Sequence, residues 1–316
     1  MADNVNDLFT DLLYKVRTEG IKEETRNGPV LTIPHPTLFS MENPRRRVLF
    51  NPERKANPYF HVMETVWMFA GSDSVEWLKQ FNQGMLNYAE PNGLVNGAYG
   101  SRWRKHFKVD QIENVVRELQ RDQNSRQAVI SMYDPTRDYL SHWKDRPCNT
   151  TIYFRTNQHG NLDMTICNRS NDLVWGACGA NAVHMSYLQE LVASAVGMNV
   201  GRYYVMSNNL HLYEPHWGLL ESPQTYDRYT NTSECTNLYP LLGWGEDYET
   251  LLQECEVFTK YETNHDYHSN WINNVVIPMY EHYMCRLNGD YSSYDVFETL
   301  DDAWCQAERD WRSWND

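Results

Sequence analysis

The chain has 316 residues, of which 41% are apolar, so it can form a large α/β or α+β domain with a buried core and is not a short peptide module. Its 42 Asp and Glu residues outnumber 28 Lys and Arg residues, and the net charge of −14 argues against DNA or RNA as a partner. The apolar runs are too short to span a bilayer, and residues 1–7 lack the basic and apolar regions of a secretory signal. We therefore expect a cytoplasmic protein with no membrane partner.

The seven cysteines are odd in number and form neither a CxxC pair nor a Cys/His cluster with zinc spacing. They lie at positions 148, 167, 178, 235, 255, 285 and 305. We therefore expect no disulfide framework and no metal centre.

Apolar residues recur at helical spacing in several segments of the first part of the chain. The pattern predicts helices, in chain order, over residues 5–16, 58–71, 75–81 and 112–119. Pro58 suits a first helical turn and Gly71 a helix end, while residues 30–33 read as a strand. Asn-Gly pairs and a further glycine indicate a loop over residues 92–100.

The middle of the chain is rich in short β-type runs separated by polar turns. Strands are expected over residues 128–133, 151–155, 162–167 and 201–206, with a long amphipathic helix over 181–196. The part from about residue 248 looks mostly helical. Because no repeat, low-complexity tract or linker is visible, we expect a single domain over residues 1–316.

Three features of this pattern could carry chemistry. Cys148 follows Pro147 at the edge of a β run, where a turn can present a thiol nucleophile, although a small buried cysteine is the commoner case. Residues 168–172 gather a guanidinium, a hydroxyl, two amides and a carboxylate, which suit an anion site or a polar turn. Glu64 lies in an apolar helix, where burial of a carboxylate is costly and raises its pKa, so it is a candidate proton handler.

Other polar residues have an ordinary structural reading beside the functional one. Asn181 follows a glycine-containing segment at a helix start, where it could simply be the N-cap. His211 and Tyr213 are two apart after a strand and would point to one face of an extended segment. Arg26 and Arg126 are typical of surface cations.

Taken together and in order, these segments resemble the thymidylate synthase superfamily over about residues 20–217. The six ordered matches are residues 61–71 around Glu64, the Tyr-Gly-x-x-Trp-Arg motif at 99–104, Asp110-Gln111, Pro147-Cys148, Arg-Ser-Asn-Asp at 169–172 and His-x-Tyr at 211–213. The resemblance implies an α+β thymidylate synthase fold, with a large mixed β-sheet packed by helices and a homodimer formed through the sheet face.

The resemblance also implies a mechanism. The thiolate of Cys148 would add to C6 of a pyrimidine nucleotide, and C5 would then attack the one-carbon group of 5,10-methylenetetrahydrofolate. Glu64 would move protons through ordered water, and Tyr99 and Asn149 would complete the catalytic set. No metal is required by this chemistry.

Binding residues follow from the same motifs. The resemblance implies that Arg26, Arg169 and Ser170 bind the 5′-phosphate, joined by Arg126 from the other subunit. Asn181 would read the base, while His211 and Tyr213 would hold the deoxyribose hydroxyl. The residues expected to bind the folate are Arg54, Met85, Trp103 and Asp172.

Several positions depart from the synthase pattern. Asn149 stands where synthases have His after the nucleophile, and Gln127 replaces the second of two paired arginines. The segment from Gly176 to Asn181 is one residue longer than the synthase Gly-Leu-Pro-Phe-Asn pattern. Met85 takes the position of a cofactor-side Trp, and residues 311–316 do not resemble the apolar tail that closes the synthase site.

The last two departures bear on the product, because water exclusion decides whether an exocyclic methylene on C5 receives a hydride or a water. They favour hydroxymethylation, and the stretch from Arg-Ser-Asn-Asp to Gly-Ala-Asn over residues 169–181 resembles phage-type hydroxymethylases, which would act in the host cytoplasm. An Asn can donate to O4 and accept from N3–H of uracil, so Asn181 favours dUMP and 5-hydroxymethyl-dUMP as substrate and product. The alternatives are a dCMP or CMP hydroxymethylase, a thymidylate synthase, and a non-catalytic nucleotide-binding homologue.

Overall fold

The computed structural model describes residues 1–140, 143–221, 223–226, 229, 239–289 and 303–315. The chain passes repeatedly between two compact units. The first unit comprises Met1–Ala56, Glu113–Tyr133 and Cys148–Asp227, and the second comprises Asn57–Ile112, Asp134–Pro147 and Arg228–Asp316. Each unit therefore combines distant stretches of sequence, and neither is a separate block of the chain.

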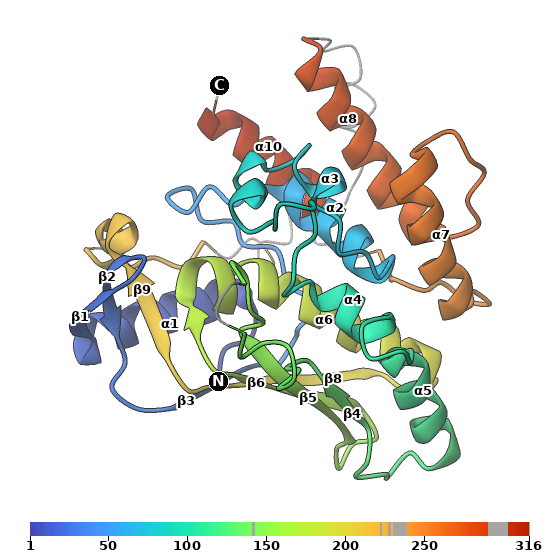
Figure 1. Ribbon diagram of the computed structural model, residues 1–316, viewed down its shortest axis with the longest axis horizontal. Helices are drawn as coiled ribbons and strands as arrows, with labels where there is room; N and C mark the ends of the chain where they lie inside the picture. The colour runs from blue at the N-terminus through green and yellow to red at the C-terminus, as the bar shows by residue number, and fades with distance from the viewer. Residues whose placement is uncertain (141–142, 222, 227–228, 230–238, 290–302, 316) are drawn as a thin grey trace. The chain divides into compact units, whose positions relative to one another are not determined.

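The first unit is built on a five-stranded mixed sheet (Figure 1). Its strands, in spatial order, are β3 (Thr37–Met41), β8 (Val200–Ser207), β6 (Leu162–Asn168), β5 (Asn149–Thr156) and β4 (Val129–Ser131). Only β6 and β8 run parallel within this sheet. The strands expected from period-two patterns are thus confirmed, as is the mixed character of the sheet.

A second sheet of the first unit has the order β1, β2, β9, β7. Its strands are β1 (Ile21–Thr25), β2 (Gly28–Thr32), β9 (Leu210–Tyr213) and β7 (Asn171–Asp172). The β1–β2 hairpin turns at Arg26 and Asn27, and Gly28 closes the turn with a φ of 108°. The parallel pairing of β7 with β9 places Asp172 opposite His211, so two motifs far apart in sequence meet here.

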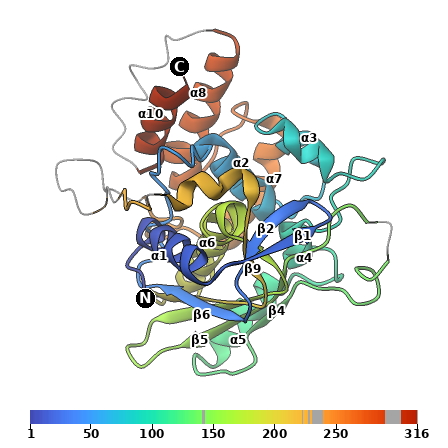
Figure 2. The same cartoon turned by 90° about the vertical axis from the view of Figure 1, so that its left-hand side faces the viewer.

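Helices cover one face of the five-stranded sheet. α1 (Val5–Glu19) begins at Asn4, whose side chain accepts hydrogen bonds from the amides of Asn6 and Asp7, and α6 (Ala180–Ala195) packs on β6 and β8 (Figure 2). The side chains that alternate toward the opposite face remain accessible, with Leu38, Tyr153 and Met206 exposed to 69%, 46% and 47%. This unit also contains η2 (Leu173–Ala177) and η3 (Glu214–Leu220).

The second unit is helical. Its elements are α2 (Pro58–Phe69), α3 (Val75–Leu78), η1 (Gln83–Asn87), α4 (Tyr99–Arg104), α7 (Tyr248–Tyr261), η4 (Ile272–Val276), α8 (Ile277–Leu287) and α10 (Ala303–Asn315). α5 (Gln111–Arg121) begins at the end of one segment of this unit and continues into the first unit. All residues of α2 are buried, and the helix packs against α7, α8 and α10. The mostly helical part expected from about residue 248 is confirmed for its described residues.

Three sequence expectations need correction. α3 ends at Leu78 instead of reaching residue 81, because the chain tightens into turns beyond it. The expected loop over residues 92–100 ends earlier, because α4 begins at Tyr99 and includes Gly100; a Cβ at Gly100 would lie 2.1 Å from the backbone oxygen of Met68, so this helix depends on a close long-range approach. The N-cap of α6 is Gly179, so Asn181 lies in the first helical turn and is not its cap.

Every helix among the described residues falls short of the length and apolar character needed to cross a membrane. In the same residues, no three His, Cys, Asp or Glu side chains gather closely enough to hold a metal ion.

Candidate active site

Cys148 is partly buried and directly precedes β5, the position expected for a thiol presented at a strand end. The backbone amide of Arg169 donates to the carbonyl of Cys148 at 2.9 Å. Arg169 itself is exposed and Ser170 is partly exposed. The expected nucleophile and two of the expected phosphate-binding residues are therefore brought together by the β5–β6 pairing.

Three buried asparagines lie beside Cys148. Asn168 donates through Nδ2 to Oδ1 of Asn149, and Asn171 donates through Nδ2 to Oδ1 of Asn168 at 3.2 Å. Asn149 and Asn168 are also paired in register across β5 and β6. Sequence reasoning included Asn149 as a catalytic residue but did not assign a role to Asn168 or Asn171, because nothing in the sequence shows that these amides meet.

The segment from Gly176 to Asn181, one residue longer than the synthase pattern, begins within the π-helix η2, at whose end the amide of Cys178 donates to the carbonyl of Leu173 at 3.1 Å. A π-turn accommodates one residue more than an α-turn, which gives the additional residue a place without displacing α6. Asn181 is partly exposed at the start of α6. Its side chain points toward Gly176, and Nδ2 lies 3.3 Å from the place that a Cβ on that glycine would take.

Asp172 caps η2, its carboxylate accepting from the amides of Val174 at 3.1 Å and Trp175 at 3.2 Å. Burial raises the pKa of Asp172, and the nearby His211 opposes this shift. Burial lowers the pKa of His211, whereas the negative charge of Asp172 raises it. The pair thus shares a partly dehydrated environment in which each group influences the protonation of the other.

The ring of His211 meets that of Tyr213 edge to face, with centroids 5.1 Å apart. His211 also hydrogen bonds through Nδ1 to Oδ1 of Asn209 at 2.8 Å, and Asn27 donates to the hydroxyl of Tyr213 at 3.4 Å. The expectation that both side chains point to one face of an extended segment is confirmed. Arg26 is exposed next to Asn27 in the β1–β2 turn, and Arg126 is exposed shortly before β4.

Arg54 is buried beside the same cluster. Its guanidinium lies 4.6 Å from the ring centroid of Trp175, and Nε donates to the carbonyl of Val174 at 3.2 Å. Burial lowers the pKa of Arg54 to about 10, while the charge of Asp172 counteracts this effect. Two of the expected folate-binding residues, Arg54 and Asp172, therefore meet around the exposed indole of Trp175, which the sequence did not single out.

The second unit holds the remaining candidates. Glu64 lies on α2 and is 7% exposed, and burial raises the pKa of its carboxyl to about 8. This raised pKa favours the protonated carboxyl at neutral pH. Tyr99 and Trp103 both lie on α4, with Trp103 almost completely buried, whereas Met85 is partly exposed in η1.

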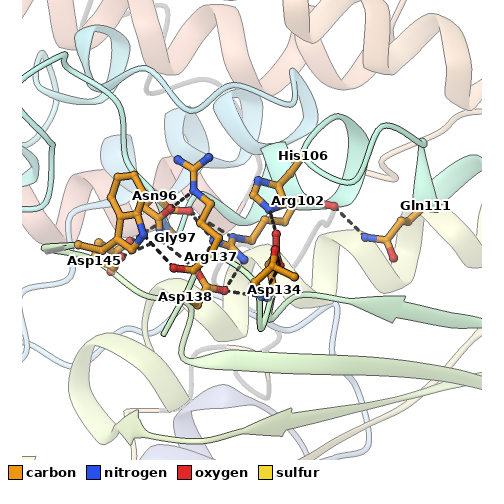
Figure 3. A network of polar contacts seen from close by, with 11 residues as sticks. Asn96, Gly97, Arg102, His106, Gln111, Asp134, Arg137, Asp138 and Asp145 are labelled. Atoms are coloured by element: carbon orange, nitrogen blue, oxygen red, sulfur yellow. Dashed lines mark hydrogen bonds and ion pairs between the residues drawn. The ribbon is translucent and has the colours of Figure 1, made fainter. Parts of the chain in front are cut away.

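A buried polar network supports α4 (Figure 3). Arg102 donates from Nη1 and Nη2 to the two carboxylate oxygens of Asp138, each at 2.7 Å, and Nη2 also donates to the carbonyl of Asn96 at 2.8 Å. Asn96 donates in turn to Asp138 at 3.0 Å and to the carbonyl of Asp145 at 3.1 Å, while the amide of Gly97 donates to the carboxylate of Asp145. The network fixes the segment that leads to Pro147, and sequence reasoning missed it because its members are distant in the chain.

Comparisons with known proteins identify a family and several named relatives. The family model described as thymidylate synthase matches residues 7–232. The chain is 37% identical over 322 residues to a deoxyuridylate hydroxymethyltransferase of Pseudomonas phage M6, covering 98% of this chain and 90% of the relative. It is 33% identical over 256 residues to the protein of the same name from Bacillus phage SP01, covering 78% of this chain and 65% of the relative.

Other relatives carry the synthase name. A putative thymidylate synthase of Methanothermobacter thermautotrophicus is 31% identical over 222 residues, covering 67% of this chain and 92% of the relative. The crystal structure of thymidylate synthase from T4 phage superposes with a TM-score of 0.55 at 20% identity, covering 66% of this chain and 77% of that one, which confirms the expected fold. On the family match and the near full-length phage relative, the chain belongs to the thymidylate synthase family.

Proposed function

We propose that this enzyme converts dUMP, 5,10-methylenetetrahydrofolate and water into 5-hydroxymethyl-dUMP and tetrahydrofolate. The observation that carries the proposal is the near full-length match to a phage protein named deoxyuridylate hydroxymethyltransferase, together with two further phage relatives of that name. The proposed place of action is the cytoplasm, or the host cytoplasm if a phage encodes the chain.

In the proposed reaction, the thiolate of Cys148 forms a bond to C6 of the uracil ring and electron density moves to C5. The folate supplies the one-carbon group that C5 attacks. Glu64 holds a proton near neutral pH because of its raised pKa, and so can both donate and accept protons as the ring is activated and the folate departs. We further propose that Tyr99 and Asn149 assist these proton and charge movements.

The substrate would be held by groups of the first unit. Arg169 and Ser170 lie next to Cys148 and offer a cation and a hydroxyl to a 5′-phosphate, as does the exposed Arg26. Asn181 would read the base edge. His211 and Tyr213, on one face of β9, would hold the deoxyribose hydroxyl.

The donor set around Trp175 fits a folate. Its exposed indole offers a stacking face, the carboxylate of Asp172 can accept hydrogen bonds from a pterin, and Arg54 provides a cation. Met85 and Trp103 of the second unit complete the proposed folate-binding set, although Trp103 offers little accessible surface of its own.

We also propose that the exposed face of the five-stranded sheet forms a homodimer. Leu38 is paired with Met206 in the β3–β8 register, and Tyr153 lies on the same sheet in β5, so large exposed side chains span several strands. Arg126 is exposed just before β4, at one edge of this sheet, from which it could reach the nucleotide of the other subunit. The isologous contact of a twofold dimer would supply two such arginines.

Thymidylate synthesis is the second candidate, because the relative from Methanothermobacter thermautotrophicus is named a putative thymidylate synthase. The two reactions share the covalent intermediate and differ in whether water or hydride reaches the C5 methylene. In this chain residues 311–315, which do not resemble the apolar synthase tail, belong to α10, a helix that packs against α2. This difference favours the water reaction.

The decisive test is mass spectrometry of the products formed with the folate and, separately, dUMP, dCMP or CMP in water enriched with heavy oxygen. The proposal predicts a hydroxymethyl product of dUMP that carries solvent oxygen, and no product from a Cys148→Ser variant that still binds dUMP. A methyl product with dihydrofolate would identify a thymidylate synthase, and a product from dCMP or CMP alone would identify a different hydroxymethylase. Absence of turnover with every nucleotide would leave a nucleotide-binding homologue.

A further inference from the structure

The asparagines beside the nucleophile form a directional ladder. Asn149, Asn168 and Asn171 lie on β5, β6 and β7, and all three are buried. Asn171 donates to Asn168, and Asn168 donates to Asn149, so the amide nitrogens of Asn171 and Asn168 both point along the ladder toward Asn149, the neighbour of Cys148 in the chain. The ladder therefore ends in the amide oxygen of Asn171.

This terminal oxygen receives no hydrogen bond from any described residue, although Asn171 is only 2% exposed. A buried amide oxygen left without a hydrogen-bond donor costs about 1–3 kcal/mol, so a donor near this oxygen would stabilise the protein. The oxygen lies next to Gly176, since a Cβ on that glycine would be 2.2 Å away from it. Glycine is needed at position 176 because any side chain would displace this oxygen.

The amide nitrogen of Asn181 is a donor close to this oxygen. Its Nδ2 lies 3.3 Å from the same Cβ position on Gly176, and its side chain makes no hydrogen bond to the residues that the structure describes. The oxygen of Asn171 and the nitrogen of Asn181 thus lie close to one point; they form no direct hydrogen bond in the structure, and a single water between them would connect them. The amide of Asn181 can satisfy the end of the ladder.

The orientation of that amide decides which base it reads. With Nδ2 toward O4 and Oδ1 toward N3–H, an asparagine matches uracil; rotated by half a turn, it accepts from the amino group of cytosine and donates to N3. Asparagine by itself therefore accepts either base. With Asn171 on the O4 side of the bound base, Nδ2 can donate one of its two hydrogens to Asn171 and the other to O4 in the uracil orientation only.

We propose that Asn171 is a specificity-determining positioning residue, whose oxygen, aimed by the asparagine ladder, holds Asn181 in the orientation that selects uracil. The inference deepens the proposed dUMP reaction and rests on it. In the proposed complex Asn171 does not contact the substrate and acts through Asn181.

The test compares kcat/KM for dUMP and for dCMP in the parent protein and two variants. Asn171→Leu keeps the branching of the side chain but removes the terminal oxygen and the donor to Asn168, and the ratio of the two values is expected to fall by about tenfold or more as dCMP turnover rises and dUMP turnover drops. Asn171→Asp is the matched control, because the new carboxylate still accepts from Asn181, while Asn168 and Asn149 can rotate together so that Asn168 donates to the carboxylate and Asn149 donates to Asn168. Its ratio is expected to stay within about threefold of the parent value.

A ratio that is unchanged in the folded Asn171→Leu protein would overturn the proposal, as would an equal loss on both nucleotides, which marks a structural role. A fall as large in Asn171→Asp as in Asn171→Leu would also overturn it. If the parent protein does not turn over dUMP, the proposed function fails, and calorimetric Kd values for dUMP and dCMP in the same three proteins then test the ladder by their ratio alone.

Discussion

Replacing Glu64 with Gln is expected to change how the stability of the protein depends on pH. Every residue of α2 is buried, and burial raises the pKa of Glu64 from the ordinary value of 4.5 to about 8. Between these two values the folded protein keeps the proton on Glu64 while the unfolded chain has released it. Gln has nearly the same size and carries no titrating group, so it removes this difference.

The sign follows from the raised folded-state pKa. The stability that comes from protonated Glu64 is fully present below the unfolded pKa of 4.5 and is lost as the pH rises through about 8. At about 1.4 kcal/mol per pH unit, the parent protein should lose about 4 kcal/mol relative to the variant between about pH 5 and about pH 8. The variant should therefore become the relatively more stable protein as the pH increases.

Urea unfolding followed by tryptophan fluorescence measures this difference at each pH, since the chain has 11 Trp residues. Glu53→Gln, at an exposed position, is the matched control and should follow the parent. Parallel curves for the parent and Glu64→Gln would refute the reasoning from burial. A change in the same direction for both variants would point to net charge instead of Glu64.

Three further predictions concern other parts of the molecule. Arg102→Met should lower the free energy of unfolding by about 3–5 kcal/mol, because it leaves the carboxylate of Asp138 buried without its cation; a loss below about 1 kcal/mol in chemical denaturation would contradict this. Tyr59→Phe should cost about 1–3 kcal/mol in the same assay, since the hydroxyl donates to buried Glu308 at 2.8 Å, and an unchanged midpoint would show that this bond is dispensable. Met206→Asp, on the exposed sheet face, should convert the proposed dimer into a monomer in light scattering, whereas an unaltered mass would place any dimer contact elsewhere.

The sequence predicts those elements whose residues carry the signal themselves. α2 has an N-capping Asn57, Pro58 in its first turn and continuous apolar residues, so local chemistry specifies both its start and its type. β5 alternates buried Ile152 and Phe154 with exposed Tyr153, the period that identifies a strand with one accessible face. Periodicity is sufficient where one element has one buried side.

Periodicity fails for elements whose position depends on contacts with distant parts of the chain. β1 is exposed along its whole length, so it shows no alternation and is held by pairing with β2. α4 is short and lacks an apolar stripe, and its position depends on Gly100 lying against Met68. Such elements are specified by contacts that only the folded chain brings together.

The candidate site shows the same limit. Cys148, Arg169 and Asp172 could be found from their motifs, because residue type and order are visible in the sequence. The stacking of Arg54 on Trp175 could not, since it joins residues from distant parts of the chain. The π-turn of η2 is likewise visible only in the structure. It explains how the chain holds one additional residue while the side chain of Asn181 faces Gly176.

The structure changes which residues are expected to select the base. From the sequence, the identity of Asn181 alone favours uracil, yet an amide reads uracil or cytosine according to its rotation. The selecting information must then lie in a neighbour that distinguishes the amide nitrogen from the amide oxygen. In the proposed site Asn171 does so because Asn168 and Asn149 fix its own orientation, and Gly176 leaves room for its oxygen. The proposed specificity for uracil is thus a property of the ordered amides as a set, and it should be lost by a substitution that leaves Asn181 in place.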